Sequence, residues 1–149
     1  MSAQGMDGPQ GVPIAARILG AGLTYFALVF GAGFVLGPVR VLWLVPQVGT
    51  RTAELLEMPL MFAVILLASR WLHGGLLQRL GTRPRLLVGL FALACTLAAE
   101  IAVGMAMRDM SLPEVLADRD PVSGTAYCLL LVVFGLAPWW HGRTAANPR

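Results

Sequence analysis

Four long apolar runs, separated by short connections that carry most of the charge, are the feature that most constrains the fold of this chain. Of the 149 residues, 57% are hydrophobic and 13% are charged. Soluble domains have about 45–50% apolar and about 25% charged residues. The mean hydropathy of +0.73 agrees with this difference. The composition therefore predicts an integral membrane protein and argues against an ordinary soluble domain.

Each run can cross a bilayer, because a hydrocarbon core of about 30 Å needs about 20 helical residues. The runs extend over residues 18–44, 55–72, 86–107 and 122–140. Backbone groups cannot remain unpaired in lipid, and the alternating pattern of barrel strands is missing from the sequence, so each run is predicted to be an α-helix. We expect an all-α, polytopic bundle of four transmembrane helices. The first run exceeds the length that a bilayer needs, so it should tilt or bend near Gly37-Pro38.

The sequence outside these runs divides the chain into three parts. Residues 1–13 are rich in Gly, Gln and Pro and offer little to bury, which predicts a disordered N-terminal tail. Residues 14–142 form the predicted membrane domain, and residues 143–149 form a C-terminal tail.

The placement of arginine predicts the orientation of the helices, since cytoplasmic connections carry an excess of basic residues. The chain has eleven Arg and no Lys. Seven lie in the connection between the second and third runs or at the termini: Arg17, Arg70, Arg79, Arg83, Arg85, Arg143 and Arg149. The opposite side has four: Arg40, Arg51, Arg108 and Arg119. Both termini are thus predicted to be cytoplasmic. The expected partners are the lipid bilayer and either a membrane protein or a second copy of the chain, and the scattered arginines do not suggest nucleic acid.

Glu100 is the one charged residue inside the third run. An ionisable group in hydrocarbon costs several kcal/mol, so it marks a proton, ion or substrate site, or a buried ion pair. Counted along the helical rise from the inner boundary, Glu57 and Glu100 both lie about 20 Å up, in the outer half. Arg40 is long enough to reach toward that level, and Glu54 lies one turn further out. We therefore predict an intramembrane polar cluster of Arg40, Glu54, Glu57 and Glu100.

Besides the alternative that its groups point into water, two interpretations of this cluster remain open. In the first, Arg40 neutralises a carboxylate and the pair fixes helix register, which describes a nonenzymatic structural or accessory membrane module. In the second, two carboxylates near one Arg do not both ionise, which describes a small proton-coupled transporter or channel that uses Glu100. The sequence shows no catalytic constellation, because no serine has an adjacent His, Lys or nucleophile-elbow motif. A membrane enzyme whose site lies among the acids of the outer face is a third alternative. His73 and His141 lack nearby ligands for a metal, and no cofactor is expected.

Small residues at four-residue spacing predict close helix packing in the membrane. The first run contains such a pair, and the third run has a stripe of alanines with one glycine near its end. The predicted packing residues are Gly33, Gly37, Ala94, Ala98, Ala102 and Gly104. On the third run the alanines lie nearly opposite Glu100, whereas Gly104 shares the face of Glu100. Both faces are suited to close contact with another helix.

Three stretches carry a resemblance to a known group of proteins. They are GPVRVLWLVP (37–46), RTAELLEMPLM (51–61) and RDPVSGTAY (119–127). Together they resemble an uncharacterised family of small bacterial four-helix integral membrane proteins, and the likeness covers most of the chain. The resemblance implies a location in the bacterial inner membrane and the four-helix plan. It implies no activity.

Overall fold

The computed structural model describes residues 12–108, 111, 113 and 120–144. All regular structure in these residues is helical, which confirms the predicted all-α class. The elements are α1 (Ile14–Val39), the π-helix η1 (Arg40–Leu44), α2 (Val45–Val48), α3 (Thr50–Gly74), α4 (Thr82–Arg108) and α6 (Pro121–Thr144). Within the described residues, four helices are long and apolar enough to cross a membrane. The predicted tails, residues 1–13 and 143–149, lie largely outside the described residues.

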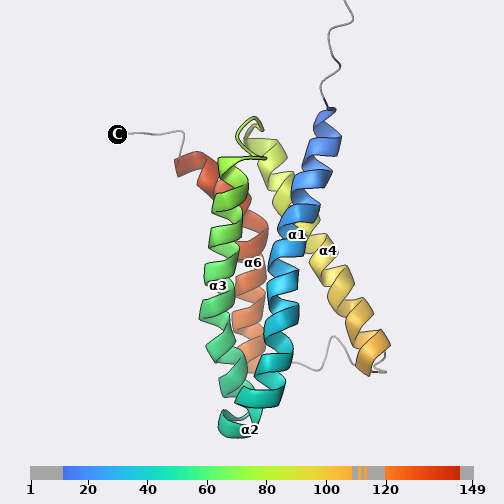
Figure 1. The fold of residues 1–149 in the computed structure, drawn as a ribbon, viewed down its shortest axis with the longest axis vertical. Coiled ribbons are helices and arrows are strands. Elements are labelled where there is room, and N and C mark those ends of the chain that lie inside the picture. Colours follow the sequence, from blue (N-terminus) through green and yellow to red (C-terminus); the bar gives the residue numbers. More distant parts are fainter. Residues whose placement is uncertain (1–11, 109–110, 112, 114–119, 145–149) are drawn as a thin grey trace, which may run out of the picture.

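The four long helices form a bundle in which each helix packs against two others (Figure 1). α1 and α6 both contact α3 and α4. In the described part of the chain, α3 and α4 do not pack against each other, so they occupy diagonal positions. The start of α1, the end of α6 and residues 75–81 lie at one end of the bundle, which we call the loop end. α2 lies at the opposite end, the α2 end, and α3 and α6 run parallel to each other between the two ends.

The first apolar run forms a helical segment of 35 residues that changes geometry near the α2 end. Pro38 lies inside α1, and the chain passes into a π-helix from Arg40. A proline has no N–H, so it removes one helical hydrogen bond and weakens the regular ladder at this point. Gly49, with φ of 79°, then makes the turn from α2 into α3. Glycine adopts this left-handed conformation without steric cost, so a single residue can join the two helices.

The closest helix contacts are made by glycines other than those predicted. A Cβ added to Gly89 on α4 would lie 2.0 Å from the carbonyl oxygen of Gly135 on α6. A Cβ added to Gly22 on α1 would meet the ring of Phe91 on α4. Both contacts lie nearer the loop end, and Figure 1 shows α4 diverging from the other helices toward the α2 end. These two glycines therefore set how closely α4 approaches its neighbours.

The predicted packing residues have different environments. Gly33 faces Met61 of α3, Gly104 is buried, and no atom lies within 4 Å of a Cβ added to Gly37. The alanine stripe is exposed on the outside of the described bundle: Ala94, Ala98 and Ala102. α4 turns the opposite face inward, where Thr96 is 6% exposed. None of the described helices therefore packs against this alanine stripe.

Candidate functional site: polar contacts between helices

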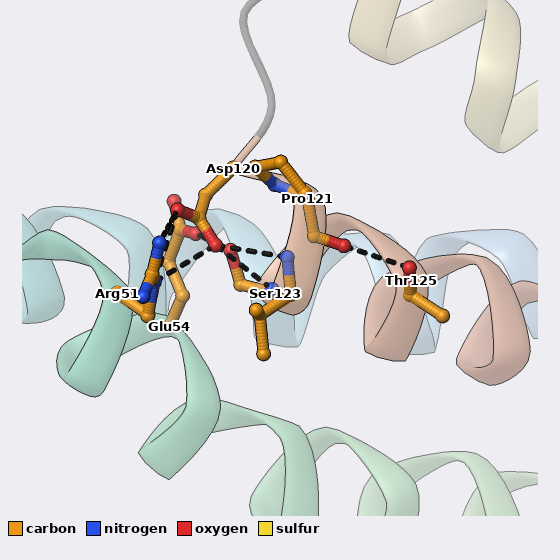
Figure 2. Close-up of polar contacts among 7 residues, drawn as sticks. Arg51, Glu54, Asp120, Pro121, Ser123 and Thr125 are labelled. Atoms are coloured by element: carbon orange, nitrogen blue, oxygen red, sulfur yellow. Dashed lines mark hydrogen bonds and ion pairs between the residues drawn. The ribbon is translucent and has the colours of Figure 1, made fainter.

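Arg51 and Asp120 join the start of α3 to the start of α6 (Figure 2). Two guanidinium nitrogens of Arg51, Nε and Nη2, donate to the Asp120 carboxylate at 3.0 and 2.6 Å. Asp120 is also the N-cap of α6, because its carboxylate accepts from the backbone N–H of Val122 at 3.0 Å and of Ser123 at 3.3 Å. Pro121 follows at the first helical position, where a missing N–H costs nothing. The carboxylate of Asp120 therefore caps the N-terminus of α6 and also binds Arg51 of the neighbouring helix α3.

The electrostatics of this contact favour the charged form of Asp120. The hydrogen bond from Arg51 lowers the pKa of the Asp120 carboxyl from its usual 3.8 to about 2, and the backbone donors at Ser123 and Val122 act in the same direction. Charge-assisted, bidentate hydrogen bonds of this type are the stronger ones in proteins. The ion pair is exposed to solvent, so screening by salt limits what it contributes.

Glu54 lies one turn further along α3 and makes a second contact with α6. The hydroxyl of Ser123 donates to the Glu54 carboxylate at 2.5 Å (Figure 2). Ser123 is buried, so this hydrogen bond satisfies a hydroxyl that has left water. The nearby hydroxyl of Thr125 donates to the carbonyl of Pro121 and stays within its own helix. The first turns of α3 and α6 are thus held together by two neighbouring side-chain contacts.

Arg40 and Glu57 form the ion pair that connects η1 with α3. Nη1 of Arg40 lies 2.8 Å from Oε2 of Glu57. The side chains of Arg40 and Glu57 are 23% and 13% exposed, so most of the ion pair is covered by other protein atoms. In a low-dielectric site the attraction is strong but each charge also loses its hydration, so such a pair fixes an arrangement more than it adds net stability. It holds the π-helical segment against α3.

Glu100 is bonded to the neighbouring helix α6. The hydroxyl of Tyr127 donates to Oε1 of Glu100, and both side chains are partly buried. Glu57 belongs to α3, the helix diagonal to α4. The structure therefore brings Arg40 together with Glu57, and places Glu54 and Glu100 against two different residues of α6.

A further polar contact lies at the loop end, between α3 and α6. Nδ1 of His141 lies 3.1 Å from the hydroxyl oxygen of Ser69 and 3.1 Å from the carbonyl oxygen of Ala137. A carbonyl oxygen can only accept, so the second contact is a hydrogen bond in the tautomer whose Nδ1 carries the proton. In that tautomer Nδ1 has no lone pair with which to take the proton of Ser69. The hydroxyl of Ser69 can donate to Nδ1 only in the other tautomer.

The sequence did not predict the contacts of Asp120, Ser123 and Tyr127 with other helices, nor the contact between Ser69 and His141. One signal was present: Asp120-Pro121 directly before an apolar run has the N-cap and first-position residues that begin a helix. The partners on other helices had no such signal, because they depend on which helices adjoin. Among the described residues, no group of three or more His, Cys, Asp or Glu could hold a metal ion.

Comparison of this chain with family models, curated proteins and solved structures found no match. Its resemblance to small bacterial four-helix membrane proteins therefore stays a prediction.

Proposed function

We propose that this chain is a nonenzymatic structural or accessory module of the bacterial inner membrane. It crosses the membrane four times, with both termini and residues 75–81 in the cytoplasm. One observation carries the proposal. Each of the four carboxylates in the described residues is bonded to a side chain from another element: Glu54 to Ser123, Glu57 to Arg40, Glu100 to Tyr127 and Asp120 to Arg51.

This pairing supports a structural role because lipid provides no hydrophobic driving force between helices. Association in a bilayer depends on close packing and on hydrogen bonds between helices. The carboxylates supply such bonds at two of the four interfaces between long helices, through Glu54 and Asp120 between α3 and α6 and through Glu100 between α4 and α6. Glu57 adds one between η1 and α3. Together they fix the order of helices around the bundle near the α2 end.

The contact between Ser69 and His141 at the loop end also favours a nonenzymatic role. Ser69 is fully buried in α3, so a substrate could not reach its hydroxyl without separating the helices. In the tautomer in which Nδ1 of His141 donates to the carbonyl of Ala137, this nitrogen cannot act as the base for Ser69. The contact instead ties α3 to α6 at the end opposite Asp120.

The rival function is proton-coupled transport or conduction through Glu100. It is favoured by the location of this carboxylate inside an apolar helix and by its contact with a hydroxyl, which can pass a proton. The two functions predict different results in reconstituted vesicles. A structural module leaves the proton permeability of the vesicles unchanged, whereas a transporter raises it in a manner that depends on Glu100.

The test reconstitutes the wild type, Glu100→Gln and Glu54→Gln into vesicles that contain a pH-sensitive dye, under an imposed pH gradient. We expect the same rate of dye response in all three samples and in empty vesicles. Glu54→Gln is the matched control, because it neutralises a carboxylate at the same end that contacts the same helix. Proton flux in the wild type that Glu100→Gln abolishes, with folding and Glu54→Gln flux retained, would overturn the structural proposal.

The orientation and the accessory role need separate measurements. A fluorescent protein that matures only in the cytoplasm, fused after Arg149, should be fluorescent if the C-terminus is cytoplasmic. Purification in mild detergent after cross-linking in the native membrane should recover one membrane protein at constant stoichiometry if the chain is an accessory subunit. A chain that is recovered alone, as a monomer or oligomer, would restrict the proposal to a self-contained structural bundle.

A further inference from the structure

A cavity of about 1130 Å³ opens between α1 and α3 at the loop end. Three arginines line it, one on each of α1, α3 and the α3–α4 connection: Arg17, Arg70 and Arg79. Among the described residues that line this cavity, none is acidic. The cavity therefore has a concentrated positive charge that no carboxylate of its own wall neutralises. A ligand with negative charge complements it.

The lining of the cavity changes along the helices, and we call the part at the loop end, with the arginines, its mouth and the part nearer the α2 end its floor. The floor includes Gly20 and Ala21 of α1 and Thr24, whose hydroxyl is bonded to the carbonyl of Gly20 and so presents no free donor. Leu67 of α3 also lines this part. Thr24 is two helical turns from Arg17, so the groove extends roughly 10 Å from the arginines toward the α2 end. It is charged at the loop end and largely apolar beyond it.

We propose that this cavity binds one anionic phospholipid, with its phosphate among Arg17, Arg70 and Arg79 and one acyl chain along Gly20 and Leu67. The division into a charged mouth and an apolar floor matches the division of a lipid into headgroup and chain. Basic pockets between transmembrane helices bind anionic headgroups by this arrangement. Trp71, 63% exposed at the mouth, belongs to the residue type that prefers the headgroup level. A soluble anion would use the arginines but not the floor.

The first test counts bound lipids by native mass spectrometry of the purified protein in detergent, titrated with phosphatidylglycerol or with phosphatidylcholine. We expect preferential retention of phosphatidylglycerol. An arginine near a membrane surface contributes enough attraction that each of Arg17→Gln, Arg70→Gln and Arg79→Gln should weaken phosphatidylglycerol binding about fivefold. Arg83→Gln is the matched control, because Arg83 is exposed at the same end and does not line the cavity. Equal loss in Arg83→Gln would show a diffuse electrostatic effect and overturn the proposal.

The second test fills the groove without changing its charge. Gly20 lines the cavity and a Cβ added to it has no atom within 4 Å, so Gly20→Leu is chosen to add apolar volume at this position. Gly31→Leu is its control, because Gly31 also has open space and lies away from the groove. We expect Gly20→Leu to lower phosphatidylglycerol binding at least fivefold and Gly31→Leu to leave it unchanged. Unchanged binding in Gly20→Leu, or equal protection against thermal unfolding by inorganic phosphate alone, would overturn the lipid assignment.

Discussion

The hydroxyl of Tyr25 on α1 donates a hydrogen bond of 3.1 Å to the carbonyl oxygen of Phe134 on α6, across the diagonal of the bundle. This carbonyl would accept from residue 138 in a regular helix, but residue 138 is a proline and has no N–H. The ring of Tyr25 also stacks on Phe134, with centroids 4.6 Å apart. One buried side chain therefore satisfies the carbonyl that Pro138 leaves open and packs against the same residue. Figure 1 shows α6 bending toward its end, as expected near a proline.

We predict that Tyr25→Phe destabilises the protein by about 1–3 kcal/mol, because the buried carbonyl of Phe134 loses its donor while the ring contact remains. The measurement is the free energy of unfolding in mixed micelles of a mild detergent and a denaturing one. Pro138→Ala restores a backbone N–H for this carbonyl. In the Pro138→Ala background the cost of Tyr25→Phe should fall to a few tenths of a kcal/mol, and the same cost in both backgrounds would contradict the compensation.

Gly89 provides the next prediction, since its missing side chain allows α4 to reach α6. The added Cβ of Gly89→Ala would lie 2.0 Å from the carbonyl oxygen of Gly135 and 3.3 Å from the ring of Pro138, so the helices must separate. Overpacking of this kind costs about 1–3 kcal/mol, and a backbone contact should give the upper end. The midpoint of thermal unfolding in detergent measures the effect. Gly31→Ala, where the new methyl group meets no atom within 4 Å, should leave the midpoint unchanged or raise it.

The ion pair of Arg40 and Glu57 should behave as a unit. Arg40→Met leaves the Glu57 carboxylate partly buried without this partner, which we expect to cost about 3 kcal/mol. The double variant Arg40→Met, Glu57→Met removes both charges and should recover most of that loss, because the desolvation cost disappears with the pair. Free energies of unfolding of the two single variants and the double variant give the coupling. Additive effects would contradict a direct interaction between the two side chains.

Much of this fold follows from the sequence because membrane crossing depends on the hydrophobicity of a segment, which is summed over its successive residues. Twenty apolar residues in succession must form a helix in lipid, so the four helices and their approximate bounds could be predicted without knowledge of their neighbours. The depth predicted for Glu57 and Glu100 rests on the helical rise in the same manner and stays a prediction. The ends are less certain from sequence: α1 begins at Ile14, before the apolar run, and its helical segment continues to Val48.

The contacts between helices could not be obtained this way, because depth does not determine which helices adjoin. Glu57 and Glu100 were expected to share a level, and the structure places them on α3 and α4, which are diagonal. Tyr127 becomes the partner of Glu100 through the packing of α4 on α6, a relationship with no local signature. The spacing of small residues also does not show which face of a helix turns inward. The alanine stripe of α4 was therefore predicted to pack against another helix, although it is exposed on the described bundle. These features depend on the order of helices around the bundle.

The contact between Arg51 and Asp120 predicts how the stability of the protein changes at acidic pH. The pKa of Asp120 is about 2 in the folded protein and 3.8 without its partners, so folding favours the charged carboxylate. The stability that this contact contributes is fully present above about pH 4 and is lost as the pH falls through about 2. Arg51→Gln removes the main cause of the shift. The pKa of Asp120 should then rise toward its usual value, although the backbone donors of Ser123 and Val122 keep it somewhat below.

Carboxyl ¹³C NMR of protein labelled at aspartate, titrated in detergent micelles, measures this pKa directly. Asp120→Asn identifies the resonance and serves as the control, because asparagine keeps the oxygen that caps α6 and cannot titrate. Its unfolding should show less dependence on pH between about 4 and 2 than that of the wild type. A wild-type pKa near 3.8, or one that Arg51→Gln leaves unchanged, would show that the guanidinium does not stay on the N-cap of α6. The N-cap would then act alone, and α3 and α6 would depend on Glu54 and Ser123 for their contact at this end.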